Sequence, residues 1–130
     1  MSTSLIPDDK RHLLDNPNFG VLGTIRPDDT VQTSPMWFEF DGETVRFTHT
    51  TTRQKFRNLQ HNASMSMAVY DPDNPVRYLE VRGRLVEVVP DPTGAFYDSL
   101  HRRYGGDGMI PPDAADRVIL VMSVEKTAGQ

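Results

Sequence analysis

The chain has 130 residues, no cysteine and a formal net charge of −4 at pH 7. Its length is typical of one domain, and no internal repeat or linker divides residues 1–130. The negative charge argues against general nucleic-acid binding, and the missing thiols exclude disulfides and thiolate metal sites. No apolar run approaches the ~20 residues that span a bilayer, and the N-terminus lacks a signal-peptide layout. We therefore expect a cytoplasmic protein without membrane insertion.

A short helix is expected first, and strands follow it. Asp8 to Leu14 can form an amphipathic helix that begins just after Pro7. The apolar segment from Phe19 to Ile25 predicts the first strand, and turn residues lead from it to a second strand, from Val31 to Phe40. Pro35 lies inside that second strand, where the missing N–H predicts a bulge or kink.

The middle of the chain alternates strand and helix. A third strand is expected from Thr44 to Thr50, after an Asp-Gly hairpin turn. Thr52 to His61 predicts a helix, because Phe56 and Leu59 fall on one face at helical spacing. From Ala63 to Tyr70, Met and Val alternate with small residues, which is typical of a half-buried strand.

The C-terminal half contains the longest expected strand, from Tyr78 to Val89, with an interruption at Gly83. Asp91 to Tyr104 predicts a helix, the glycines after it predict a hinge, and Arg117 to Val124 predicts the last strand. Strands joined by short turns, with few helices, indicate a mainly β fold. We expect a small antiparallel barrel of six or more strands with helices on the outside.

The most informative segment follows the third expected strand. Three cations alternate there, on Arg53, Lys55 and Arg57. Hydroxyl groups precede them on Thr48, Thr50 and Thr51. Cations, hydroxyls and a helix N-terminus are together the groups that bind a phosphate, so we interpret the segment as a phosphate receptor. The alternative is that the cations form the solvated face of a helix, and Arg57 could pair with a surface carboxylate.

Other chemistry-bearing residues are less specific. The sole tryptophan, Trp37, either packs in the core or lines a ligand beside Pro35 and Met36, and the sequence leaves both readings open. His49 lies beside the cation cluster, where a cofactor contact is one alternative, and we interpret it as an exposed or core histidine. The histidines lack metal-ligand spacing, and there is no nucleophile elbow or Walker loop. We expect no metal and assign no catalytic side chain.

Four segments carry a family resemblance. They are residues 20–25 (Gly-Val-Leu-Gly-Thr-Ile), 53–59 (Arg-x-Lys-x-x-Asn-Leu), 78–83 (Tyr-Leu-Glu-Val-Arg-Gly) and 117–120 (Arg-Val-Ile-Leu). In this order and spacing the chain, from about Asp9 to Val124, resembles the pyridoxamine 5′-phosphate oxidase-like superfamily of FMN-binding split β-barrels. Within it, the chain is most similar to the actinobacterial deazaflavin-dependent oxidoreductases of the B type, which use coenzyme F420.

The resemblance implies a homodimer whose two cofactor sites lie in grooves between the subunits. It implies that Arg53, Lys55 and Arg57 hold the cofactor phosphate with help from the threonines. It also implies that part of the second strand runs along the tricyclic ring, namely Ser34, Pro35, Met36 and Trp37. Tyr78 would approach from the partner subunit. The polyglutamate tail of coenzyme F420 would suit exposed cations, on Arg57 or on Arg102 and Arg103.

The implied activity is hydride transfer from reduced coenzyme F420 to a small conjugated, planar acceptor such as a quinone, an enone or a tetrapyrrole. FMN carries the same ribityl phosphate, so an FMN-binding oxidoreductase or flavin carrier on this fold remains open. A non-catalytic F420-binding protein is a further alternative. The chain stops at Gln130 without the longer C-terminal segment of the full oxidases. Pyridoxamine phosphate oxidation is therefore not expected.

Overall fold

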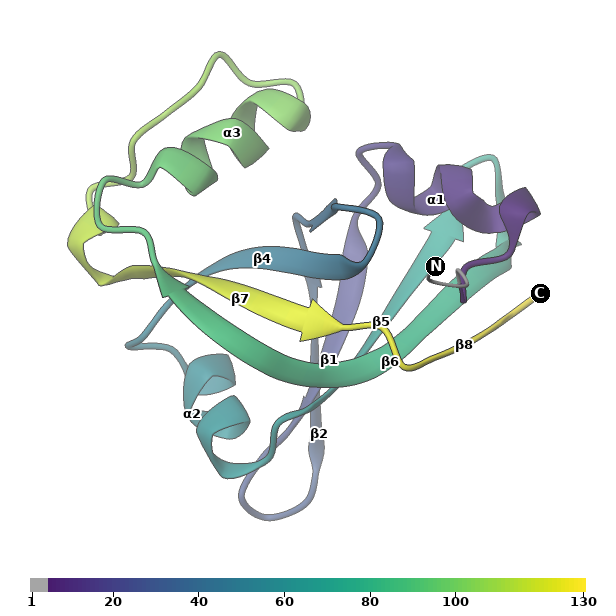
Figure 1. The fold of residues 1–130 in the computed structure, drawn as a ribbon, viewed down its shortest axis with the longest axis horizontal. Coiled ribbons are helices and arrows are strands. Elements are labelled where there is room, and N and C mark those ends of the chain that lie inside the picture. Colours follow the sequence, from purple (N-terminus) through teal and green to yellow (C-terminus); the bar gives the residue numbers. More distant parts are fainter. Residues whose placement is uncertain (1–4) are drawn as a thin grey trace.

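The structure is a computed structural model that describes residues 5–130 (Figure 1). Its strands are β1 (Gly20–Ile25), β2 (Val31–Met36), β3 (Glu39–Phe40), β4 (Thr44–Thr50), β5 (Ser64–Asp71), β6 (Asn74–Pro90), β7 (Arg117–Ser123) and β8 (Lys126–Gly129). Its helices are α1 (Arg11–Asp15), α2 (Gln54–His61) and α3 (Ala95–Arg103), with 3₁₀ turns at Asp8–Lys10 and Ala114–Asp116. Among the residues described, no helix is both long and apolar enough to cross a bilayer.

One long strand, β6, joins the two halves of the sheet. The strands form an 8-stranded antiparallel arrangement in the order β2-β1-β5-β6-β7-β4-β3, with β8 added along β6. β6 has 17 residues and pairs with β5 through its first part and with β7 from Leu85 to Pro90. It curves through the centre of the molecule (Figure 1). β2 and β3 are left as the two free ends of this path, and the predicted mainly β, antiparallel fold is confirmed.

The predicted interruption at Gly83 is wrong, because β6 is continuous there. A Cβ atom at Gly83 would collide with the backbone carbonyl of Ser123, so the glycine permits two backbones to approach closely. The irregularity lies farther along β6, where the register with β7 shifts between Leu85 and Glu87. The glycine therefore marks a close approach of two chain segments.

The predicted bulge or kink at Pro35 is wrong as well, because the pairing of β2 is regular there. Pairing between β2 and β1 runs without a shift from Ile25↔Val31 to Gly20↔Met36, with Pro35 opposite Val21. A proline is tolerated here because β2 is an edge strand, so one side of its backbone has no ladder to complete. The chain instead leaves the strand after Met36, and the predicted single strand from Val31 to Phe40 is divided into β2 and β3.

The last strand, β8, was not predicted from the sequence. Lys126–Gly129 has no buried residue and only one half-buried residue, Thr127, so it lacks the alternation that identifies a strand. It is held instead by backbone pairing with β6, where Leu79 lies opposite Gly129. The Thr127 hydroxyl also donates a 2.8 Å hydrogen bond to the Leu5 carbonyl.

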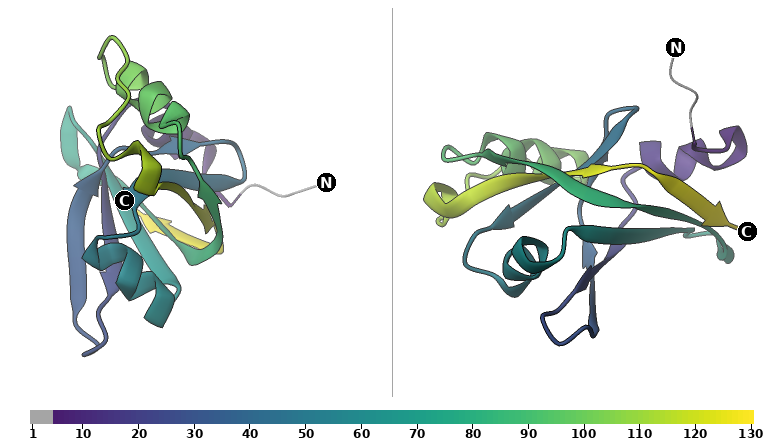
Figure 2. Two further views of the ribbon diagram at one scale, coloured as in Figure 1. Left: turned by 90° about the vertical axis from the view of Figure 1, so that its left-hand side faces the viewer. Right: turned by 60° about the horizontal axis from the view of Figure 1, so that its bottom comes forward.

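The core lies between the strands and is closed by helices on the outside (Figure 2). On β4, Val45 and Phe47 are fully buried and face inward, as the alternation of a strand requires. α1 contributes Leu13 and Leu14 to the same cluster. In both views of Figure 2, α1 and α3 lie toward one side of the strands and α2 toward the other. The predicted placement of helices outside the strands is confirmed.

Asn58 attaches α2 to the sheet. Its side-chain NH₂ donates to the Thr24 hydroxyl on β1 at 3.1 Å and to the Gln32 side-chain oxygen on β2 at 2.9 Å. Its own oxygen accepts a 2.8 Å hydrogen bond from Gln54 in the same helix. Asn58 and Thr24 are both fully buried. The position of the α2 N-terminus, which carries the cation cluster, therefore depends on this polar contact in the interior.

Arg103 and Tyr104 fix the segment between β2 and β3. The Arg103 guanidinium donates to the Phe38 carbonyl at 3.1 Å and to backbone carbonyls of Leu14, Asp15 and Asn16. The Tyr104 hydroxyl accepts a 3.0 Å hydrogen bond from the Phe38 N–H and donates to the Asn18 carbonyl at 2.8 Å. These bonds hold the turn that contains Trp37 in place. The Arg103 guanidinium therefore binds backbone carbonyls and is not an exposed cation for the polyglutamate tail of a cofactor. Arg102 forms an ion pair with Asp98.

We expect Asn58→Ala to lower the free energy of unfolding by about 1–3 kcal/mol, because it leaves the buried Thr24 hydroxyl without this partner. Urea denaturation would measure the change. Gln60→Ala is the matched control, since Gln60 lies exposed on the same helix and should change stability by less than about 0.5 kcal/mol. Equal stability of Asn58→Ala and the control would show that the contact does not attach α2.

Candidate functional site

The N-terminus of α2 opens onto a groove of about 450 Å³. Arg53, in an extended conformation (φ −96°, ψ 159°), immediately precedes the helix, and Lys55 lies in its first turn. The polar and charged lining residues are Ser34, Thr48, His49, Arg53, Lys55 and Arg117. The apolar and aromatic lining residues are Phe19, Pro35, Met36, Trp37 and Tyr97. We call this the cation groove.

The cation groove lies where the sheet is incomplete. β3 pairs with β4 only at Arg46 and Val45, so residues 47–50 of β4 are paired with β7 on one edge alone within the described chain. β2 ends at Met36 on the other side, as the terminal strand of the sheet order. The groove is lined by residues from the end of β4 (Thr48 and His49) and from the end of β2 (Ser34, Pro35 and Met36). The opening in the barrel therefore forms the groove.

The structure brings together seven of the residues that the sequence singled out: Ser34, Pro35, Met36, Trp37, Thr48, Arg53 and Lys55. Four others lie elsewhere. Thr50 is buried and shares a 3.2 Å hydrogen bond with Thr52, and Thr51 is exposed. Arg57 donates to the Thr52 carbonyl and the Gln54 side chain on its own helix. Tyr78 lies near the start of β6, paired with Tyr70, and does not line this chain's groove.

Two of the three cations that line the groove, Arg53 and Lys55, have no acidic partner among the described residues. Within residues 5–130, every Arg–carboxylate or Lys–carboxylate ion pair involves other residues, and neither Arg53 nor Lys55 takes part in one. Partial burial, and then the positive charge of Arg53, lower the pKa of the Lys55 ammonium. A bound anion would compensate both charges. The site therefore has the electrostatic character of an anion receptor.

Three buried polar atoms in the groove also lack partners. In the described part of the chain, the Ser34 Oγ, Thr48 Oγ1 and His49 Nε2 atoms make no hydrogen bond. Buried polar groups are nearly always hydrogen-bonded, so three such atoms around one opening indicate that a ligand supplies their partners. A phosphate with its hydroxyl-bearing chain offers acceptors and donors of the required kind. The residues present therefore fit a phosphorylated cofactor.

Sequence reasoning missed Arg117 and Tyr97 and assigned no ligand contact to His49. Arg117 is held by Asp113 at 3.1 Å, and its guanidinium lies over the Tyr97 ring, 4.7 Å from the centroid. β7 places Arg117 directly opposite Thr50, and α3 places Tyr97 beside Trp37. Both arrive from distant parts of the sequence. Arg117 begins one of the segments that carry the family resemblance, but no local pattern shows that either residue lines the groove.

Trp37 is one wall of the groove and part of an aromatic cluster. Its ring stacks on Tyr104 with centroids 5.3 Å apart, and it contacts Tyr97 at 5.8 Å and His101 at 5.9 Å. Trp37 itself is half-buried. The sequence left open whether Trp37 packs in the core or lines a ligand site. In the structure one side of its indole packs on α3, and the residue also lines the groove. Such a surface suits a flat ligand.

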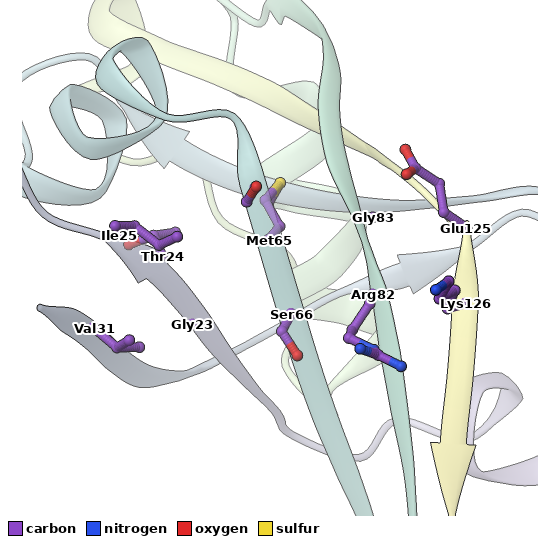
Figure 3. Close-up of a pocket in the computed structure, with 11 residues that line it drawn as sticks. Gly23, Thr24, Ile25, Val31, Met65, Ser66, Arg82, Gly83, Glu125 and Lys126 are labelled. Carbon is purple, nitrogen blue, oxygen red and sulfur yellow. The ribbon is translucent and has the colours of Figure 1, made fainter. Parts of the chain in front are cut away.

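A larger hollow of about 590 Å³ crosses β1, β5, β6 and the segment that leads into β8 (Figure 3). Gly23 and Ser66 lie in it, and Arg82 and Lys126 point from its far side in Figure 3. Arg82 is paired with Glu80 at 3.5 Å, so part of the positive charge is already compensated. No residue of the segment 51–59 lines this hollow. We therefore assign the anion receptor to the smaller cation groove.

An open antiparallel barrel with an anion-binding groove at its opening defines a class of cofactor-binding proteins. The chain belongs to the pyridoxamine 5′-phosphate oxidase family, whose model matches residues 6–130. The predicted split-barrel fold is thereby confirmed. No curated protein matches the chain.

Solved structures extend this result. A protein named F420 reductase is 52% identical, with a TM-score of 0.93, over 96% of this chain and 100% of that one. A conserved hypothetical protein from Mycobacterium tuberculosis is 21% identical, with a TM-score of 0.72, over 99% of this chain and 88% of that one. HupZ from Group A Streptococcus is 17% identical, with a TM-score of 0.68, over 95% of this chain and 93% of that one. The last two share the fold alone.

We expect Lys55→Met to stabilise the free protein by a few tenths to about 1 kcal/mol, because it removes a partly buried cation beside Arg53. Urea denaturation at low ionic strength would measure the gain. Added salt should reduce this gain in stability, since salt screens the repulsion between Lys55 and Arg53 in the wild-type protein. Lys10→Met, at a position outside the groove, is the control and should show no such gain. A destabilised Lys55→Met protein would contradict the view that this charge is uncompensated.

Proposed function

We propose that this protein is an oxidoreductase that uses coenzyme F420. The 52% identity to a protein named F420 reductase, over nearly the whole of both chains, supports this cofactor. Membership of the pyridoxamine 5′-phosphate oxidase family supports a phosphorylated, flavin-type ring in general. One observation carries the proposal: Arg53 and Lys55, which form no ion pair with any described residue, line a groove with an aromatic wall. The groove also contains buried polar atoms that have no hydrogen-bond partner in this part of the chain.

Different residues of the groove bind different parts of the cofactor. Arg53 and Lys55 bind the cofactor phosphate, since Arg supplies a fork of donors and Lys a compact charge. The Ser34 and Thr48 hydroxyls provide hydrogen bonds along the cofactor. Trp37 and Tyr97 provide a flat surface that excludes water from one side of a ring.

When bound, reduced coenzyme F420 supplies a hydride to an electron-poor acceptor. The protein's contribution is to hold the ring, leave one face accessible and place the acceptor beside it. We propose a conjugated, planar acceptor of the quinone, enone or tetrapyrrole kind, because the apolar lining around Trp37, Tyr97 and Met36 suits a flat molecule. No side chain is assigned as the proton donor.

We further propose that the protein acts in the cytoplasm as a homodimer. Several large apolar side chains are exposed on the single chain, which favours burial against a second copy: Val31, Tyr70, Val76, Tyr78 and Val86. In such a dimer, Tyr78 would complete the groove of the partner. In support of this arrangement, Tyr78 is exposed and does not line the groove of its own chain.

The cofactor assignment is tested by titrating the protein with coenzyme F420 and following Trp37 fluorescence. We expect Lys55→Ala to weaken binding by about 10-fold or more, since a charge-assisted contact to phosphate is worth about 1.5–3 kcal/mol. Lys10→Ala is the matched control. Unchanged affinity in Lys55→Ala would remove Lys55 from the site.

Cofactor identity and catalysis are separated by two further measurements. FMN that survives gel filtration with the protein, while coenzyme F420 does not, would select the FMN-binding alternative. Tight binding of coenzyme F420 without oxidation of its reduced form by any quinone or enone in a broad panel would favour a non-catalytic carrier.

The dimer is tested by light scattering, for which we expect the mass of two chains. Tyr78→Ala should weaken binding of coenzyme F420 by several-fold, because it truncates a contact donated to the partner's groove. Ile110→Ala is the comparison, since Ile110 is exposed and does not line the groove, and it should bind like the wild type. A monomeric protein that binds the cofactor normally would overturn this arrangement.

A further inference from the structure

We propose that His49 is a further ligand-binding residue of the cation groove. It donates a hydrogen bond from Nε2 to the anion held by Arg53 and Lys55. It also takes up a proton as this anion binds. The identity of the natural anion, the cofactor phosphate, rests on the proposed function. The role of His49 rests on its placement in the groove.

His49 lies at the end of the inward face of β4. It follows Val45 and Phe47 on that face, at spacings of two residues, but it lines the groove where they are enclosed by the core. Only 3% of the residue is exposed, and Nε2 has no hydrogen-bond partner among the residues described. Buried nitrogens of this kind are nearly always hydrogen-bonded, and no protein group within the described residues bonds this one. A ligand in the groove would supply the missing partner.

The charges around His49 identify the kind of ligand. Lys55 and Arg53 at the start of α2 and Arg117 on β7 line the same groove as His49, and their charges act on its ring. The carboxylate of Asp113 pairs with Arg117. A ligand that binds among these cations is an anion, and an anionic oxygen only accepts hydrogen bonds. Nε2 must then carry a proton. The imidazole is a donor to the bound anion.

The same surroundings explain why a proton is taken up. Burial first, and then the charges of Lys55, Arg53 and Arg117, lower the pKa of His49 to about 4, so the imidazole of the free protein is neutral near pH 7. An anion placed among these groups brings negative charge beside the ring and raises its pKa. By linkage, protonation of His49 then favours binding of the anion as much as the anion favours protonation.

The sign of the pH dependence follows. Anion affinity rises as the pH falls through the pKa of the bound state, and the gain stops near the lower pKa of the free state. One proton allows at most about a tenfold change in Kd per pH unit. A histidine with a purely structural role would leave the affinity independent of its own titration.

The experiment is isothermal titration calorimetry of the wild-type protein with coenzyme F420 and, separately, with sulfate, which stays fully ionised between pH 5.5 and 8. Repeating each titration in two buffers with different heats of ionisation measures proton uptake directly. We expect net proton uptake near pH 6 and a Kd that decreases several-fold from pH 8 to pH 6. This wild-type measurement does not depend on the folding of any variant.

His49→Gln provides the second test, because its amide can donate a hydrogen bond but cannot take up a proton. We expect about 5-fold or more weaker binding at pH 6, with the pH dependence and the proton uptake abolished. His61→Gln is the matched control, since His61 is exposed at the end of α2 and does not line the groove. It should bind like the wild type.

The outcomes separate this inference from the proposed function. Binding of coenzyme F420 without proton uptake, and with the same affinity in His49→Gln, would overturn the role of His49 and leave the cofactor assignment intact. Proton-linked binding of sulfate without binding of coenzyme F420 would support His49 and overturn the cofactor assignment. Binding of neither anion at any pH would overturn both.

Discussion

The continuity of β6 is the constraint on which the rest of the structure depends. Because one strand pairs with β5 in its first part and with β7 in its second, two sheets share a single backbone and must curve around one core. The path that results begins at β2 and ends at β3, and these two ends do not pair with each other in the described chain. The groove lies between β2 and the part of β4 that β3 leaves unpaired. The same pairing that stabilises the barrel therefore also leaves the opening that forms the groove.

The opening is electrostatically unfavourable without a ligand. The positive charge of Arg53 lowers the pKa of Lys55, and neither residue has a carboxylate partner within residues 5–130. The protein as a whole is acidic, so this local excess of positive charge is not a consequence of composition. Asn58 and the α2 helix hold the cations in place through buried hydrogen bonds to β1 and β2. The interior thus holds the two cations in place although neither is compensated by a carboxylate of the described residues.

The parts of the molecule that could be predicted are those with local causes. The strand from Thr44 to Thr50 has the predicted bounds, because its alternation and the preceding hairpin turn are both local signals. The cations of residues 53–57 were visible for the same reason. Pro35 and Gly83 were misread because their effects depend on which strand lies beside them, and a sequence does not state that.

Tyr97 and Arg117 were missed on similar grounds. Each reaches the groove only through long-range pairing or packing, Arg117 through β7 and Tyr97 through α3. His49 was seen but taken as structural, since nothing in the sequence shows that its Nε2 atom lacks a partner. Predicting a site that is assembled from distant segments requires the register of the sheet.

The cations and the aromatic wall of the groove come from different segments of the chain. The cations belong to the turn after β4, whereas Tyr97 belongs to α3, which is fastened to the body of the protein by Arg103 and Tyr104. Replacement of Tyr97 can reshape the aromatic wall while those two anchors and the cation cluster stay unchanged. Descendants of one ancestral barrel could in this way diversify the molecules they reduce while inheriting the same attachment point for the redox carrier.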